Sequence, residues 1–276
     1  MTHTIGISGS TIMSNEKKFN ELFQKKITHI EIGEFENEQA FQRFLQLHRN
    51  SNKTFGIHSP VFRSGSKYDL LEKFQHSPEK AWHLFEQEIR RLVQLDAKYI
   101  LVHFPYFQGT AQNPEILIEQ GLKRLSELQL KYNLPIVCEP KLGLDRSPKG
   151  IEYLDAFPLA SWKKYGLKLC IDIGDYLLAA DENALEMIQK WKDHIKVVHL
   201  HNIEFMNDKY IWIPIHPSHE DDGKHYPIKE ILHVLAESPD IYWVLEHTPH
   251  SNPSKTFIDE GLHWLMNDFL DTDILI

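Results

Sequence analysis

Residues 167–174 read Leu-Lys-Leu-Cys-Ile-Asp-Ile-Gly, an apolar run that ends in Asp172, two positions before Gly174. A turn-forming residue just after a buried run marks the point where a strand gives way to a loop. Asp172 is therefore predicted to lie at the carboxyl end of a strand. Five other apolar runs also end in a side chain that can bind a metal ion, and most are soon followed by Pro or Gly: they end in His58, His103, Glu139, His199 and Glu246.

The strands that this pattern predicts alternate with segments of helical periodicity. The predicted strands are His3–Ser8, Thr28–Ile32, Thr54–Ile57, Tyr99–Val102, Pro135–Cys138, Leu167–Ile171, Ile195–His201 and Tyr242–Glu246. Apolar residues recur at helical spacing in Ala81–Leu95, Ile116–Tyr132, Ala184–Trp191, Ile228–Leu235 and Phe257–Phe269. Alternation of strand and helix indicates parallel pairing, and eight such units predict an α/β fold of the closed (β/α)8 barrel type. An open doubly wound sheet is the structural alternative.

Length and composition allow one or two domains. A barrel of this kind commonly uses about 250 residues, so residues 1–276 are expected to form a single domain. We find no interdomain linker and no repeat beyond the strand–helix unit. No stretch approaches the roughly 20 apolar residues that span a bilayer, and Met1–Thr11 lacks the features of a secretory signal, so a cytoplasmic protein without membrane partners is expected.

Charge and residue types narrow the chemistry. The net charge of −9 disfavours nonspecific attraction to nucleic acid. Cys138 and Cys170 each lie inside an apolar run, where small buried thiols are expected. With 17 histidines and 2 cysteines, a metal site would use imidazole and carboxylate ligands, which suit zinc, manganese, cobalt, iron or magnesium. Ser8–Thr11, after the first strand, matches neither the dinucleotide fingerprint nor the Walker pattern.

The six strand-end residues are separated by about one strand–helix unit each. In a parallel barrel the carboxyl ends of the strands form one ring, so residues far apart in sequence would meet there. A single histidine at a strand end is commonly a hydrogen-bonded scaffold residue. Three buried acids, Glu139, Asp172 and Glu246, are different because each would be costly in a barrel mouth unless a cation compensates for its charge. The series therefore predicts a metal site.

Six short motifs, in this order, resemble the xylose isomerase-like TIM barrel superfamily. That superfamily groups sugar isomerases and epimerases, related dehydratases and endonuclease IV. The resemblance covers nearly the whole chain, most clearly from the third strand to the eighth. The motifs are Gly56–Pro60, Leu101–His103, Val137–Glu139, Cys170–Gly174, Val197–Leu200 and Val244–Glu246.

The resemblance implies a ligand set and a reaction. The four protein ligands of one divalent cation (manganese, zinc, cobalt or magnesium) would be Glu139, Asp172, His199 and Glu246. His58 and His103 would hold the substrate or a second ion. Glu139 and Glu246 stand where related epimerases use two metal-bound glutamates to move protons next to a polarised carbonyl. The resemblance thus implies a metal-dependent isomerase or epimerase of a sugar, sugar derivative or polyol.

Other reactions of the superfamily are alternatives. One is zinc-dependent cleavage of abasic DNA, as in endonuclease IV, and another is a dehydratase or hydrolase on the same ion. A barrel that binds a metabolite without catalysis is a third. The additional zinc site of endonuclease IV would correspond to Asp175, Pro217 and His219, of which proline has no ligand atom, and this disfavours the endonuclease. Asp175 and His219 remain candidates for a second ion or for the substrate.

Two long connections are expected to cover the catalytic face, namely Ser59–Gln75 and Glu204–Tyr226. Arg63 in the first and Lys224 in the second are candidates to bind an anionic group of a substrate, with solvated loop charges as the alternative. Tyr68 and Trp212 would stack on a sugar ring or pack the loops.

Two residues near the candidate ligands can be read in more than one way. Lys141 follows Glu139 by two positions and would either meet the substrate or lie on the surface. His201 shares a strand face with His199, and the resemblance favours His199 as the ligand. The sequence leaves the substrate, the metal and the oligomeric state open.

Overall fold

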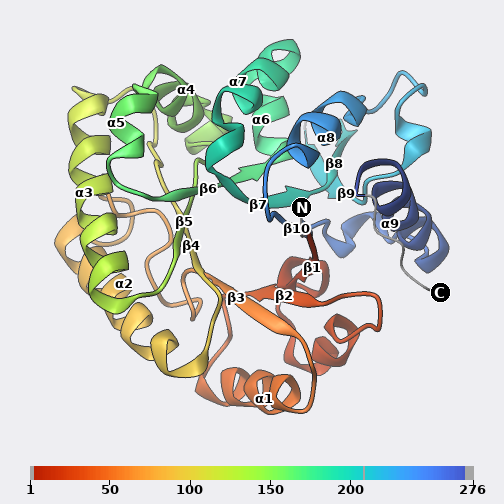
Figure 1. The fold of residues 1–276 in the computed structure, drawn as a ribbon, viewed down its shortest axis with the longest axis horizontal. Helices are drawn as coiled ribbons and strands as arrows, with labels where there is room; N and C mark the ends of the chain where they lie inside the picture. The colour runs from red at the N-terminus through yellow and green to blue at the C-terminus, as the bar shows by residue number, and fades with distance from the viewer. Residues whose placement is uncertain (1–2, 208, 271–276) are drawn as a thin grey trace.

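The strand–helix repeat closes into a parallel barrel in the computed structural model, which describes residues 3–207 and 209–270 (Figure 1). The order around the barrel is β1-β2-β3-β4-β5-β6-β7-β10, and β10 pairs with β1 to complete the ring. This confirms the predicted barrel and excludes the open sheet. The barrel strands are β1 (Thr4–Ser8), β2 (His29–Ile32), β3 (Thr54–His58), β4 (Ile100–His103), β5 (Ile136–Glu139), β6 (Lys168–Asp172), β7 (Ile195–Leu200) and β10 (Tyr242–Leu245).

Helices surround the barrel and cover its outer face (Figure 1). The α-helices are α1 (Glu38–Arg49), α2 (Pro78–Leu92), α3 (Pro114–Tyr132), α4 (Lys149–Ala156), α5 (Leu159–Lys163), α6 (Ile173–Ala180), α7 (Ala184–Trp191), α8 (Lys229–Ala236) and α9 (Lys255–Phe269). The first unit departs from the predicted repeat, because β1 and β2 are joined by the 3-10 helices η1 (Gly9–Ile12) and η2 (Glu16–Leu22) and not by an α-helix. Further 3-10 turns are η3 (Val93–Leu95), η4 (Leu144–Arg146), η5 (Asp181–Asn183), η6 (Lys192–His194), η7 (Pro217–His219) and η8 (Pro249–Ser251).

Several helices begin at residues whose side chains cap the first turn. Asn37, Ser77 and Ser254 accept hydrogen bonds from backbone N–H groups in the first turns of α1, α2 and α9. In α2, Pro78 follows the cap at a position where its missing N–H costs nothing. These local signals set where the chain turns from loop to helix, and the apolar face of each helix then packs on the barrel.

The connection after β7 is more regular than the sequence predicts. The first part of Glu204–Tyr226 belongs to an antiparallel hairpin, with β8 (Asn202–Met206) paired to β9 (Lys209–Ile213). The hairpin turns at Asn207, whose φ of 57° lies in the left-handed region that asparagine tolerates. This hairpin was not predicted from the sequence.

Inward-facing residues of the strands form layers inside the barrel. One apolar cluster inside the barrel consists of Tyr99, Leu101, Val137, Cys170, Val197 and Val244. Side chains alternate between the two faces of a strand, so the inward residues one step nearer the carboxyl end share a layer as well. In β4, β5, β6, β7 and just after β10 these residues are His103, Glu139, Asp172, His199 and Glu246.

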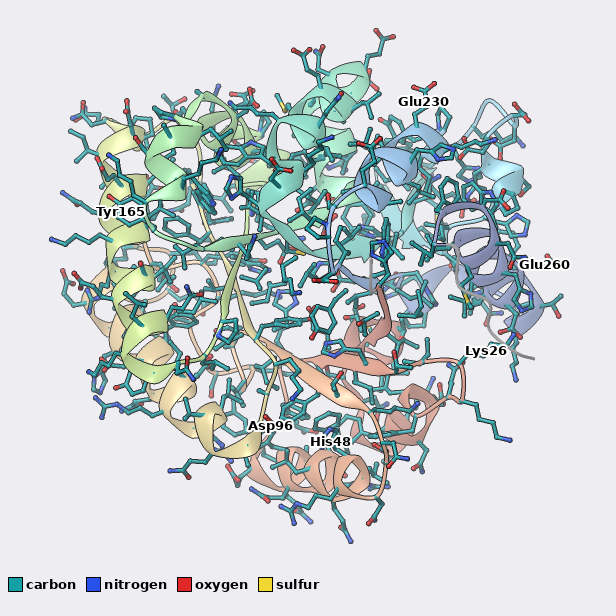
Figure 2. The ribbon with its side chains drawn as sticks, viewed as in Figure 1. Lys26, His48, Asp96, Tyr165, Glu230 and Glu260 are labelled. Carbon is teal, nitrogen blue, oxygen red and sulfur yellow. The ribbon has the colours of Figure 1, made fainter. Side chains whose placement is uncertain are left out.

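The outward-facing strand residues pack against the helices in the main core. Ile136, Cys138, Ile171 and Trp243 belong to this core, whereas Cys170 lies inside the barrel. Both cysteines are buried free thiols, as predicted. Charged side chains such as Lys26, Glu230 and Glu260 lie at the periphery (Figure 2). In residues 3–207 and 209–270 no helix is long and apolar enough to cross a membrane.

Candidate metal centre

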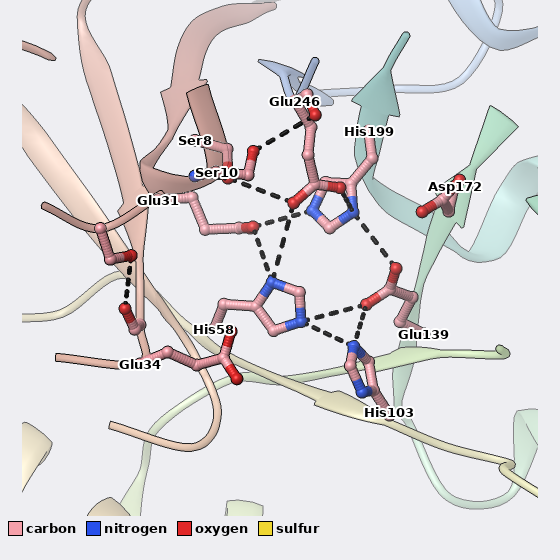
Figure 3. A network of polar contacts seen from close by, with 12 residues as sticks. Ser8, Ser10, Glu31, Glu34, His58, His103, Glu139, Asp172, His199 and Glu246 are labelled. Carbon is pink, nitrogen blue, oxygen red and sulfur yellow. Dashed lines mark hydrogen bonds and ion pairs between the residues drawn. The ribbon is translucent and has the colours of Figure 1, made fainter. Parts of the chain in front are cut away.

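The predicted ligands converge at the carboxyl end of the barrel. Strand register sets His103 beside Glu139 and Asp172 beside His199. One ligand atom from each of four residues lies within 4.8 Å of the others, and this group consists of Glu139, Asp172, His199 and Glu246. A second group with the same spacing consists of His58, His103 and Glu139. The six residues thus form one continuous polar cluster (Figure 3).

His199 lies at the centre of this cluster and is fully buried. Its Nδ1 is 2.6 Å from Glu246 Oε2 and 3.3 Å from Glu139 Oε1, so this nitrogen faces the other candidate ligands. Its Nε2 is 2.8 Å from Glu31 Oε1 on the opposite side of the ring. Burial lowers the pKa of His199, but the surrounding anionic groups outweigh burial and hold the pKa well above its usual value.

Lys141 extends into the cluster and contacts three carboxylates. Its Nζ lies 2.6 Å from Asp172 Oδ2, 2.9 Å from Asp175 Oδ2 and 3.0 Å from Glu139 Oε1. Burial lowers the pKa of Lys141, yet these carboxylates raise it well above the usual value, so the ammonium is charged. Of the two interpretations of Lys141, the structure therefore excludes an exposed surface lysine.

Asp172 is oriented by neighbours on both sides. Its Oδ1 accepts a hydrogen bond from the backbone N–H of Asp175 (2.9 Å), which makes it the cap of α6. The same oxygen lies 2.7 Å from Nε2 of His201, which is thus a partner of Asp172. Burial raises the pKa of Asp172, but Lys141 and His201 outweigh this and lower it. Burial and the charge of Asp172 raise the pKa of Asp175 to about 7.

His58 and His103 meet on the far side of Glu139. Their Nε2 atoms are 2.8 Å apart, and Glu139 Oε2 is 3.3 Å from His58 and 3.1 Å from His103. Although burial lowers the pKa of His58, its bonds to Glu139 and Glu31 raise it to about 9. Burial lowers the pKa of His103 to about 3. The pair therefore consists of one charged and one neutral imidazole.

The charge balance of the cluster fits a divalent cation. Five carboxylates surround the same two basic side chains. Glu31 and Glu246 lie within 4.0 Å of His58, and Glu139, Asp172 and Asp175 lie within 4.0 Å of Lys141. Among the described residues, Lys141 supplies the only lysine or arginine nitrogen within 4.0 Å of them. Glu139 Oε2 is buried, and the polar atoms described next to it are the Nε2 atoms of His58 and His103 at 3.3 and 3.1 Å. The other positive charges in contact with them are on His58 and His199, whose pKa values these carboxylates raise, so the five carboxylates still outnumber the three cationic side chains. Buried carboxylates in excess are costly, and a carboxylate and imidazole set suits manganese, zinc, cobalt or magnesium.

A cavity of about 730 Å³ opens above the cluster. Its floor includes His58, Lys141 and Glu246, while Glu139 and His199 are buried below. Both long connections contribute to its wall, as predicted for segments that cover the catalytic face; the contributing residues are Arg63, Lys67, Tyr68 and Trp212.

Aromatic and charged side chains of the wall are held in place by specific contacts. The ring of Tyr68 stacks on His103, with centroids 5.0 Å apart. Trp212 packs against His201, with centroids 4.2 Å apart, and lies so close to Gly174 that a Cβ there would be 2.4 Å from the indole. Arg63 donates to the backbone oxygens of Glu34 (3.0 Å) and Met13 (3.1 Å). The cavity therefore has a defined shape.

Two of the predicted site residues lie elsewhere. His219 borders a separate pocket of about 390 Å³, together with His225 and Phe257. Lys224 is exposed on the turn before His225 and does not appear among the described residues that line the central cavity. Asp175 contacts Lys141, so the structure does not bring it together with His219.

Two residues of the site were missed in the sequence. Glu31 is fully buried and contacts both His199 (2.8 Å) and His58 (3.5 Å), as Figure 3 shows. Burial raises the pKa of Glu31, but these imidazoles outweigh burial and lower it. Ser8, at the end of β1, donates a hydrogen bond to Glu246 (3.1 Å). Glu31 comes two residues before Gly33 in a predicted strand, so an acid near a strand end was a usable signal.

Comparisons with solved structures and family models agree with this architecture. A D-tagatose 3-epimerase-like protein is similar at a TM-score of 0.66 and 16% identity, over 96% of this chain and 99% of that chain. A D-psicose 3-epimerase solved in the presence of D-fructose is similar at 0.63 and 11%, over 98% and 100%. The IOLI protein with a binding zinc atom is similar at 0.66 and 12%, over 99% and 100%.

At these identities the structural neighbours show a shared fold. No curated protein sequence matches the chain. A family model described as "Xylose isomerase-like TIM barrel" matches residues 15–267, which is most of the sequence. The chain therefore belongs to the xylose isomerase-like TIM barrel family.

Proposed function

We propose that this protein is a divalent-metal-dependent isomerase or epimerase of a sugar or sugar derivative. The observation that carries the proposal is the convergence of four ligand atoms within 4.8 Å of one another beneath an open cavity; they belong to Glu139, Asp172, His199 and Glu246. Structural neighbours named as a D-tagatose 3-epimerase-like protein and a D-psicose 3-epimerase support the substrate class. The excess of carboxylates over cations supports the metal, with manganese, zinc, cobalt and magnesium as candidates.

The two glutamates are proposed to move the proton. A cation held by the four ligands would polarise a carbonyl oxygen of the substrate and so acidify the neighbouring C–H bond. Glu246 reaches the cavity, and Ser8 donates to its Oε1, so we assign it the removal of the proton. Glu139 is assigned the return of a proton from the other side. Because Lys141 Nζ lies 3.0 Å from Glu139 and lines the cavity, we assign it contact with a substrate oxygen.

The walls of the cavity suit a polyol. Tyr68 and Trp212 provide aromatic faces, and Arg63, Lys67 and Glu34 provide polar groups at the rim. Lys67 is paired with Glu34 at 3.0 Å, so these groups offer both donors and acceptors. Small-molecule sites of this kind combine apolar walls with a few oriented polar groups.

The test begins with elemental analysis and a substrate screen. Purified protein, supplied with manganese, zinc, cobalt or magnesium, is incubated in D2O with ketoses, aldoses and keto acids. The proposal expects a changed sugar that carries deuterium at the reacting carbon. Glu246→Gln should lower turnover by roughly 100-fold or more, because it removes the acid–base group. The matched control is Glu260→Gln, at an exposed ion pair with His216, which should retain full activity.

Two outcomes would contradict the proposal. The first is a folded Glu246→Gln variant that turns over an identified substrate as fast as the unaltered protein. The second is robust incision of a duplex that carries one abasic site, which would favour the endonuclease alternative.

A further inference from the structure

A column of hydrogen-bonded polar side chains runs from the ligand cluster down the inside of the barrel. Glu31 Oε1 is 2.8 Å from His199 Nε2, and Glu31 Oε2 accepts from the Tyr99 hydroxyl at 2.7 Å. His29 Nε2 is 3.1 Å from the Tyr99 oxygen, and His29 Nδ1 is 2.8 Å from Thr54 Oγ1. His29, Glu31, Tyr99 and His199 are at most 1% exposed. The column therefore lies in a part of the barrel that water does not reach.

Neighbouring strands leave space for this column. A Cβ on Gly56 would lie 2.5 Å from the Tyr99 ring, so only glycine fits opposite that ring. A Cβ on Gly6 would lie 3.3 Å from the His29 ring. Branched apolar residues usually fill the interior of such barrels, and buried polar groups are costly unless each is paired. Packing of the barrel interior alone therefore does not explain a chain of paired polar groups in this position.

The hydrogen atoms of the column all point toward Glu31. A carboxylate only accepts, so Tyr99 must donate to it, and the Tyr99 oxygen is then left to accept from His29 Nε2–H. Burial lowers the pKa of His29 to about 3, so this imidazole is neutral and its Nδ1 accepts from Thr54. Aligned donors polarise one another and strengthen the last bond in the chain. The same carboxylate rule requires His199 to carry a proton on Nε2.

We propose that Glu31, supported by Tyr99 and His29, is a positioning residue of the metal centre. It keeps a proton on His199 Nε2. When a cation takes the place of the proton on Nδ1, which lies 2.6 Å from Glu246 and 3.3 Å from Glu139, the Nδ1 lone pair would then face that cation. Glu31 itself lies below His199 and is not among the described residues that line the cavity. A carboxylate behind a ligand histidine fixes the ring and raises its basicity. The inference rests on the metal binding in the proposed function, although not on its reaction.

Metal affinity is the readout of the test. Protein stripped with a chelator is titrated with Mn2+ or Zn2+ against a chromophoric competitor, and unfolding of the stripped protein is followed in parallel. Glu31→Gln should weaken binding by about 10–100-fold, the usual effect of losing such a partner. Tyr99→Phe, which removes only the hydroxyl, should weaken it by a smaller factor in the same direction.

Tyr242→Phe is the matched control. The Tyr242 ring packs on His29 (4.4 Å) and Tyr99 (5.2 Å), at the same level of the barrel. Its hydroxyl forms none of the column's hydrogen bonds in the described structure, so metal affinity should not change. In zinc-loaded protein labelled with 15N-histidine, His199 should show a strongly hydrogen-bonded Nε2–H signal that shifts in Glu31→Gln but not in Tyr242→Phe.

Several results would overturn the inference. One is a folded Glu31→Gln variant with unchanged metal affinity. Another is complete loss of binding in Glu31→Gln with no change in Tyr99→Phe, because this would make Glu31 a direct ligand. If Glu31→Gln does not fold, unchanged metal affinity in Tyr99→Phe would overturn the inference instead.

The positioning role and the proposed reaction fail in different ways. Unaltered protein that binds the cation but converts no sugar would reject the reaction and leave the role of Glu31 standing. The positioning role itself would be overturned if the unaltered protein bound no cation, or if its cation affinity did not depend on Glu139.

Discussion

Replacing Lys141 with glutamine should make the stability of the protein depend on a divalent cation. The ammonium lies 2.6–3.0 Å from Asp172, Asp175 and Glu139, and its side chain is only 18% exposed. Glutamine keeps part of the length and the hydrogen-bonding capacity but carries no charge. The three carboxylates would then repel one another in a buried site, with no lysine or arginine between them in the described structure.

The size of the effect follows from the burial of the site. Removal of one partner from a buried ion pair costs about 3–5 kcal/mol. In a chain of this length, a loss of about 4 kcal/mol lowers Tm by roughly 10 °C. A cation that binds the same carboxylates only in the folded state stabilises by about 4 kcal/mol at 1,000 times its Kd. The unaltered protein binds it too, but with the ammonium beside the same carboxylates, so the cation should bind Lys141→Gln more tightly and narrow the difference between the two proteins.

The assay is thermal unfolding of both proteins, once with a chelator and once with excess Mn2+. The Tm of Lys141→Gln should lie roughly 10 °C below that of the unaltered protein with chelator, and this gap should be smaller with Mn2+. Lys149→Gln is the control, because it breaks a surface pair with Glu152 and should change Tm little in either condition. An equal Tm loss with and without Mn2+ would refute the reasoning, because the cation and the ammonium would then not share these carboxylates.

Two further predictions concern stability. Burial raises the pKa of Glu88 from 4.5 to about 7, and the group accepts from Ser59 and from the backbone of Val61. Its stabilising contribution is thus complete below pH 4.5 and lost as the pH rises toward 7. Glu88→Gln cannot ionise, so its stability relative to the unaltered protein should rise by about 2–3 kcal/mol between pH 5 and pH 8 in denaturant unfolding. A pH-independent difference would contradict this. Gly56→Ala should lower the free energy of unfolding by about 1–3 kcal/mol, because its Cβ overlaps the Tyr99 ring. Gly109→Ala has open space around it and should lower it little. Equal losses of unfolding free energy in the two variants would argue against that packing.

The barrel and its ring of polar residues were predictable from local patterns. Short apolar runs that end near Pro or Gly indicated parallel strands, and the two-residue period of a strand indicated which side chains share a face. Because the carboxyl ends of all strands lie at one end of a barrel, His103, Glu139, Asp172, His199 and Glu246 were expected at the same place. The structure brings them together there.

The sequence patterns did not predict the positions of side chains that lie on loops or beyond the hairpin after β7. Lys141 follows Pro140, beyond the end of β5, so its direction was not determined by strand alternation. The path of the chain after β9 took His219 to a separate pocket. In both cases the position of a side chain depends on how a segment packs, and apolar periodicity carries little information on such packing.

The sequence by itself determined the barrel, the inward direction of the candidate ligands and the chemical character of the site. Only the tertiary structure decided which inward residues touch: Glu31 with His199, 168 positions away, and Tyr99 with His29, 70 positions away. The physical reason is that alternation along one strand tells whether a side chain points inward. Which side chain it meets across the barrel depends on the tilt and stagger of strands that closure imposes.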